Sequence, residues 1–124
     1  MPVSFTGELN GNGYEIQNLF LDVTSPYGTC LSVGLFCYLD GTVKNLGIIN
    51  ADVASNDDHA AILAGYSLEQ TNVDNCYTSG CVYAVIDAGG LVNGYGNISN
   101  CWADVDVYAE GDGAGGIAGG LSTG

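Results

Sequence analysis

Residues 34–48 read GLFCYLDGTVKNLGI, and this stretch is the clearest copy of the unit that decides the fold. The unit opens with a glycine or alanine beside an aliphatic pair and then makes a turn. An apolar residue, one spacer and an asparagine follow, and the chain continues apolar. Degenerate copies of this unit occur along most of the sequence, which indicates a repeat protein.

Two landmarks of the unit recur at nearly the same interval. The asparagine recurs, at intervals of 27, 30 and 25 residues, at Asn18, Asn45, Asn75 and Asn100. The upstream aliphatic residue recurs, at intervals of 26, 28, 28 and 26 residues, at Leu9, Leu35, Leu63, Leu91 and Ile117. A shared period of about 20 to 50 residues is typical of a solenoid, a propeller or another repeat array.

The residue types between the glycines favour strands over helices. Valine, isoleucine, tyrosine and threonine are frequent there, whereas lysine, which helical repeats use heavily, occurs once in the chain. Each unit has room for three short strands separated by turns. We therefore predict an all-β chain that forms a right-handed parallel β-helix, a β-solenoid, of four to five rungs of roughly 25–30 residues.

The length of 124 residues and the composition indicate one domain. With 47% hydrophobic and 12% charged residues, the chain is too apolar to be a disordered segment. We expect a single β-solenoid domain over residues 1–124, with rungs at roughly 5–33, 34–60, 61–88 and 89–113 and a partial rung at 114–124.

The recurrent asparagines are predicted to mark a bend in each rung. The inward-facing residue two positions upstream of the asparagine is, in turn, Ile16, Val43, Val73 and Ile98. The inward positions restart one residue after the asparagine, so the chain must bend there, in a conformation that asparagine tolerates. Stacked on successive rungs, the four side chains would form an amide ladder of Asn18, Asn45, Asn75 and Asn100. Alternatively, each asparagine only suits its own turn.

The charge balance excludes several classes of partner. Fourteen acidic residues stand against one lysine and no arginine, which gives a formal net charge of −13. We therefore expect no nucleic-acid binding and no adhesion to anionic lipid, since both need basic side chains. No run of about 18 apolar residues is present, so we expect no membrane insertion. The acidity suits a well-solvated surface, and Ca²⁺ binding by clustered carboxylates is the alternative, with no other cofactor expected.

The five cysteines are an odd number, so at least one of them is a free thiol or pairs between chains. Cys76 and Cys101 occupy equivalent positions in neighbouring rungs. Stacked strands lie about 4.8 Å apart, a spacing that a disulfide accepts. A cross-rung disulfide is therefore possible, and the alternative is that both are buried thiols. His59 is the one histidine and completes no zinc site with the cysteines.

One residue further along, an outward-facing column is predicted to contain Phe20, Gly47, Tyr77 and Trp102. Tyr77 stacked on Trp102 would be an exposed aromatic contact. Such a pair could pack against sugar rings or a neighbouring molecule. It could equally stiffen the sheet through cross-strand packing.

No constellation of residues predicts an enzyme. Polysaccharide lyases and pectin hydrolases use parallel β-helices. The lyases need a strong cationic base and a cation that neutralises a uronate, but this chain has no arginine, and Lys44 lies within the repeat. The hydrolases need facing carboxylates, and the near pairs here are Asp57 with Asp58, Asp104 with Asp106, and Glu110 with Asp112. Acidic residues on strand surfaces commonly serve solubility, so we predict no catalytic residues.

The glycine-rich openings resemble the GLUG repeat of bacterial surface proteins, such as filamentous-haemagglutinin-like adhesins and IgA-protease-like proteins. The residues that carry the resemblance are 34–37 (GLFC), 62–65 (ILAG), 90–93 (GLVN) and 116–119 (GIAG). Residues 5–16 are similar to the lead-in rung that often precedes such arrays. The final glycine of the motif is replaced at Cys37 and Asn93. The resemblance implies an extracellular stalk or adhesive solenoid and carries over no catalytic residue.

These features together predict a structural, non-enzymatic module located outside the cell or at its surface. It would act as a rigid stalk or adhesin segment, or as a filament subunit. No capping helix is predicted at either end of the solenoid, so we expect self-association end to end through uncapped rungs. The alternative is a carbohydrate-binding or carbohydrate-active β-helix, with host or surface glycans as partners.

Overall fold

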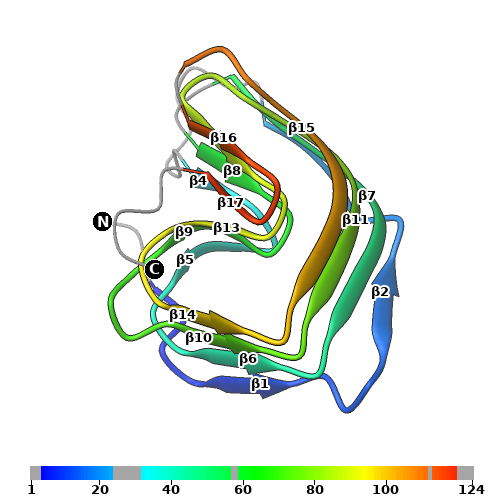
Figure 1. The fold of residues 1–124 in the computed structure, drawn as a ribbon, viewed down its shortest axis with the longest axis vertical. Coiled ribbons are helices and arrows are strands. Elements are labelled where there is room, and N and C mark those ends of the chain that lie inside the picture. The colour runs from blue at the N-terminus through cyan, green and yellow to red at the C-terminus, as the bar shows by residue number, and fades with distance from the viewer. Residues whose placement is uncertain (1–3, 24–31, 57–58, 112, 120–124) are drawn as a thin grey trace.

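The computed structural model of the protein describes residues 4–23, 32–56, 59–111 and 113–119. Within these residues the chain is all-β and coils into a solenoid whose wall has four faces (Figure 1). Every strand pairing is parallel and joins residues that lie one circuit of the chain apart. The predicted parallel β-solenoid is therefore confirmed.

The first face, at the bottom of Figure 1, stacks three-residue strands: β1 (Glu8–Asn10), β6 (Thr42–Lys44), β10 (Asn72–Asp74) and β14 (Asn97–Ser99). The second face, on the right, stacks longer strands: β2 (Glu15–Gln17) with β3 (Phe20–Val23), β7 (Gly47–Ser55), β11 (Tyr77–Ala84) and β15 (Trp102–Ala109). In the first rung two short strands take the place of one long strand, since β2 and β3 both pair with β7.

Two further faces close the solenoid on the left of Figure 1. The third face contains β4 (Ser32–Val33), β8 (His59–Ala61), β12 (Asp87–Gly89) and β16 (Gly113–Gly115). The fourth face contains β5 (Phe36–Leu39), β9 (Ala64–Ser67), β13 (Val92–Gly94) and β17 (Ala118–Gly119). The four rungs are thus β1–β5, β6–β9, β10–β13 and β14–β17, and about three turns separate the first rung from the last.

Each rung has strands on four faces, so the prediction of three strands in a rung was wrong. The segment Asp52–Ala54 continues β7 instead of forming a strand of its own, and the residues after the acidic turn supply the missing strand. β7 stays continuous because it takes up one extra residue as a bulge. Asn50 has a φ of 58° at this bulge, and its N–H donates to Ser79 Oγ at 2.9 Å.

The core is closed in the two middle rungs. Inward side chains there are at most 6% exposed, among them Val43, Ile48, Val53, Leu63, Val73, Val82 and Leu91. The column of Leu35, Leu63, Leu91 and Ile117 stacks through backbone hydrogen bonds at the corner between the third and fourth faces. Burial of these apolar columns supplies the main stabilisation of the fold.

The first rung is aligned differently from the prediction. Leu9, not Ile16, lies opposite Val43, and Ile16 lies opposite Ile48. The shift arises because an extra turn separates β1 from β2. Asn12 and Gly13 have φ values of 54° and 82° in this turn, a conformation that glycine and asparagine favour.

Candidate functional site

The predicted asparagine ladder exists only in part. Asn75 Nδ2 donates to Asn45 Oδ1 at 2.8 Å, and Asn45 Nδ2 donates to Asn10 Oδ1 at 3.1 Å. Asn45 and Asn75 have φ values of 57° and 55°, so each marks a bend in the left-handed region. Asn10, which the repeat spacing did not predict, therefore takes the place expected for Asn18.

Asn18 and Asn100 make contacts other than those predicted. Asn18 belongs to a second column, in which Asn50 Nδ2 donates to Asn18 Oδ1 at 2.8 Å. Asn100 Nδ2 donates to Asp74 Oδ1 at 2.8 Å instead of bonding to Asn75. Hydrogen bonds from Asn100 and then Ser99 lower the pKa of the Asp74 carboxyl. The prediction of a single ladder of four asparagines was therefore wrong. The Asp74 carboxylate accepts the hydrogen bond of the Asn100 amide, and the shifted alignment of the first rung puts Asn10 in the place of Asn18.

The predicted aromatic contact between Tyr77 and Trp102 is a parallel stack. The ring centroids lie 4.8 Å apart and the planes differ by 8°. Gly47 lies below Tyr77 in the same column, where any side chain would overlap the tyrosine ring. Tyr77 also donates a hydrogen bond to Glu15, which raises the pKa of the phenol. Phe20 is not in this column, since it lies opposite Asp52.

A second stack that the sequence did not reveal lies at the far end of the same two strands. Tyr83 and Tyr108 have centroids 5.4 Å apart and planes that differ by 8°. In both stacks the rings face one another along the axis of the solenoid. One face of Trp102 and one of Tyr108 therefore point beyond the fourth rung, and these residues are 53% and 61% exposed.

Cys76 and Cys101 are free thiols, so the possible cross-rung disulfide is not formed in this structure. They occupy adjacent strands, and the Trp102 N–H donates to the Cys76 carbonyl at 3.2 Å. A hydrogen bond to Cys101, together with burial, raises the pKa of the Cys76 thiol. The same bond from Cys76 lowers the pKa of Cys101 to about 7. Cys81 is also a free thiol, Cys37 is disulfide-bonded, and Cys30 lies outside the described residues.

His59 has partners that sequence reasoning missed. Its Nδ1 lies 3.0 Å from Asp87 Oδ2, and its ring centroid lies 5.5 Å from that of Tyr66. The pair follows from the register of the third face, in which His59 lies opposite Asp87. Burial, followed by the charge and hydrogen bond of Tyr95, raises the pKa of Tyr66. This cluster joins the third face to the fourth.

Of the near carboxylate pairs named from the sequence, the structure describes both members only for Asp104 with Asp106. Ser79 and Cys81, not carboxylates, lie opposite Asp104 and Asp106. Asp57, Asp58 and Asp112 lie outside the described residues. The part of the chain that the structure describes contains no group of three or more His, Cys, Asp or Glu residues that could hold a metal ion. No helix among the described residues could span a membrane.

The single lysine of the chain, Lys44, forms an ion pair. Lys44 Nζ lies 3.0 Å from Glu8 Oε1, which joins the first and second rungs on the outside of the first face. Both side chains are at least 36% exposed, so the pair contributes little to stability.

Comparisons with known proteins give one informative match. No family model matches the chain, and no solved structure matches it. The chain is 38% identical over 88 residues to halomucin of Haloquadratum walsbyi. The match covers 71% of this chain but 1% of halomucin, so the chain spans a very small part of that relative. The β-solenoid and this match fit a structural role and an extracellular or surface location.

Proposed function

We propose that the chain is a structural, non-enzymatic module of an extracellular β-solenoid, which serves as a stalk or adhesin segment. Further rungs, from the same polypeptide or from another copy, would cover its two end rungs. The resemblance to GLUG repeats supports this function, as does similarity to a short part of a far longer protein.

The observation that carries the proposal is the loss of burial at both ends of the core. In the column of Leu21, Val53, Val82 and Val107, the two middle residues are 1% and 2% exposed. Leu21 and Val107, in the end rungs, are only partly buried. The same holds for Leu9 and Ile98 on either side of Val43 and Val73.

This pattern favours stacking because each inner rung is completed by its neighbours. In a solenoid the stability of a rung depends on the interfaces above and below it. An added rung would cover Val107 and would extend the stacks that end in Trp102 and Tyr108. The strand edges of β14 and β15 would gain backbone partners at the same time.

Sedimentation and negative-stain microscopy of the purified chain at micromolar concentration would test self-stacking. We expect assemblies that grow in one dimension as the concentration rises. Val107→Asp places a charge on the end of the core and should block them. Ile86→Asp makes the same change at an exposed apolar residue in a turn of the third rung and should leave them intact.

A second measurement separates a module of a longer array from a filament subunit. A polypeptide in which one copy follows another should unfold at a higher temperature than the single copy, since one pair of end rungs becomes buried. If the single copy stays monomeric and the tandem copy gains no stability, the proposed function is wrong.

A further inference from the structure

The corner between the fourth and first faces is longer in one rung than in the others. Residues 40–41 join β5 to β6, and residues 95–96 join β13 to β14. Four residues, Leu68–Thr71, join β9 to β10, and Glu69 and Gln70 project as exposed residues. Insertions in repeat proteins gather on one face, which is often the binding face.

This longer corner is firmly held. The Leu68 N–H and the buried Thr71 hydroxyl both donate to the Leu39 carbonyl, each at 2.7 Å. The Thr71 N–H donates to the Leu68 carbonyl at 3.1 Å and closes the turn. The Gln70 N–H donates to Asp40 Oδ1 at 2.9 Å. The conformation is therefore set before any ligand arrives, which lowers the cost of binding.

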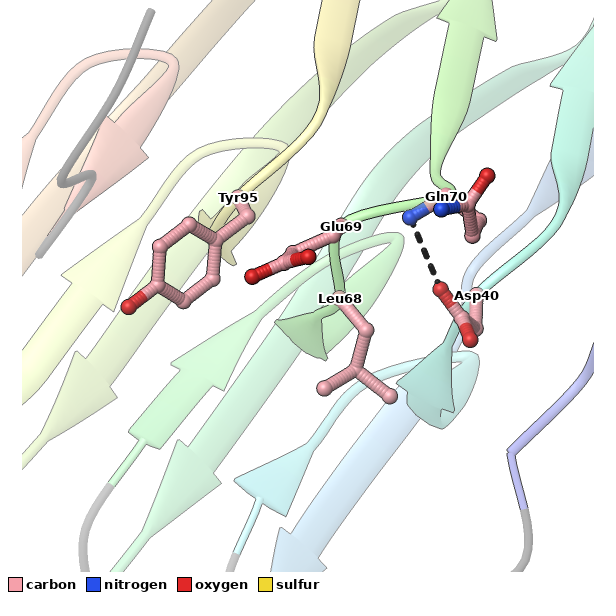
Figure 2. Close-up of a pocket in the computed structure, with 5 residues that line it drawn as sticks. All are labelled: Asp40, Leu68, Glu69, Gln70 and Tyr95. Atoms are coloured by element: carbon pink, nitrogen blue, oxygen red, sulfur yellow. Dashed lines mark hydrogen bonds between the residues drawn. The ribbon is translucent and has the colours of Figure 1, made fainter.

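A pocket of about 340 Å³ lies at this corner, and Figure 2 shows its lining side chains. The volume is near the lower end of the roughly 300–1,000 Å³ of small-molecule sites. Leu68 and the ring of Tyr95 supply apolar surface, whereas the polar groups come from Asp40, Glu69 and Gln70. A site of this size suits one ring-sized unit with an apolar side and a polar side.

The aromatic wall is fixed in place by its neighbours. The Tyr95 ring packs edge-on against Tyr66, with centroids 6.3 Å apart and planes at 85°. The Ser67 hydroxyl donates to the Tyr95 carbonyl at 2.6 Å and holds the backbone. The ring can therefore act as a preformed platform for the C–H side of a ligand.

The polar wall offers mainly hydrogen-bond acceptors. Within the described residues, the Glu69 carboxylate and the Gln70 side-chain amide make no hydrogen bond or ion pair. Asp40 uses Oδ1 for the Gln70 N–H and keeps Oδ2 for a ligand. A ligand must therefore supply donors, and hydroxyl groups do so. Anionic ligands would meet two carboxylates on a chain of net charge −13.

We propose that this pocket binds a single neutral sugar unit. One face of the sugar packs on Tyr95, and its hydroxyl groups donate to Glu69 and Asp40. Uronates and sulfated sugars are excluded by repulsion from the same carboxylates. This binding activity is additional to the proposed structural role and does not depend on it.

The test is an NMR titration of the whole chain with four probes. These are methyl β-D-glucoside, methyl β-D-galactoside, methyl α-D-mannoside and glucuronate. At least one neutral glycoside should receive saturation transfer and shift the amide signals of Gln70 and Tyr95. Loss of the aromatic platform in Tyr95→Ala should raise Kd about tenfold.

Two variants make the result decisive. Glu69→Ala removes an exposed side chain that makes no hydrogen bond or ion pair within the described residues, and it should raise Kd about threefold or more. Tyr14→Ala, at a tyrosine of the first rung that is 75% exposed, should leave Kd unchanged. The proposal is overturned if no neutral glycoside binds, if glucuronate binds as tightly, or if Glu69→Ala has no effect.

Discussion

The side-chain amide of Asn75 lies 2.8 Å from the side-chain oxygen of Asn45, one rung below it, and both residues have left-handed backbone angles. The two roles are separable. The conformation allows the bend between the first and second faces, whereas the hydrogen bond joins neighbouring rungs. Glycine at either position could adopt the bend but could not form the side-chain hydrogen bond.

Asn75→Ala should therefore destabilise the chain more than Asn75→Gly. Alanine loses the amide bond and is strained at a φ of 55°, so we expect a loss of about 1–3 kcal/mol in the free energy of unfolding. Glycine loses the bond but adopts the angle freely, and the loss should be smaller. Urea denaturation measures both, and equal losses would show that the backbone angle is not strained in the alanine variant.

The hydrogen bond from Tyr77 to Glu15 predicts a loss of stability at high pH. The bond raises the pKa of Tyr77 above its ordinary value of 10.0 in the folded chain. Its contribution to stability is therefore complete below that value and is lost as the pH rises through the raised pKa. Tyr77→Phe should therefore remove part of the decline in unfolding free energy that sets in as the pH rises above about 10.

The matched control is Tyr14→Phe, at a tyrosine that is 75% exposed. It removes a hydroxyl that takes no part in the Tyr77–Glu15 hydrogen bond, so the decline attributed to Tyr77 should persist. A Tyr77→Phe profile that overlays the profile of the unmodified chain would show that the bond to Glu15 does not persist in solution.

The thiol pair predicts one unusually reactive cysteine. Because the pKa of Cys101 is lowered to about 7 by its bond from Cys76, alkylation of Cys101 by iodoacetamide should rise with a midpoint near that pH. Cys76, buried and with a raised pKa, should react slowly throughout. Mass spectrometry of the alkylated peptides distinguishes the sites.

Cys76→Ala supplies the control for the thiol pair. Without the donor, the midpoint for Cys101 should move up towards its ordinary value of 9.0. If the pH midpoint of Cys101 alkylation does not change in this variant, the reactivity of Cys101 arises from its exposure at the fourth rung and not from its hydrogen bond with Cys76.

The repetitive part of the fold could be predicted because its signal is local and recurs. Leu35, Leu63, Leu91 and Ile117 are all aliphatic and recur with nearly the same period, and they stack as a column. The first rung could not be aligned, because the extra turn at Asn12 and Gly13 offsets every later position in that rung.

Contacts between unlike residues were harder to predict than the repeat. Nothing near His59 in the sequence indicates Asp87, and the two meet only because β8 and β12 pair in one particular register. Asn100 bonds to Asp74 because a carboxylate accepts more strongly than an amide, and spacing alone cannot show that competition. The pocket depends on two extra residues, Glu69 and Gln70, which deviate from the repeat.

The glycines at the corner after the third face give the sharpest test of the open end. A side chain at Gly90 would overlap the Gly116 carbonyl of the next rung, whereas a side chain at Gly116 would meet nothing within 4 Å. Gly90→Ala should therefore cost about 1–3 kcal/mol of unfolding free energy, as overpacking of a closed core does. Gly116→Ala should change the stability of the isolated chain by less than about 0.5 kcal/mol.

The same two glycines test the proposed assembly. If another rung covers the fourth rung, Gly116 takes the position that Gly90 has now. Gly116→Ala should then weaken end-to-end assembly in sedimentation while leaving urea denaturation of the monomer unchanged. An assembly that tolerates alanine at Gly116 would mean that the copies do not continue the solenoid in register.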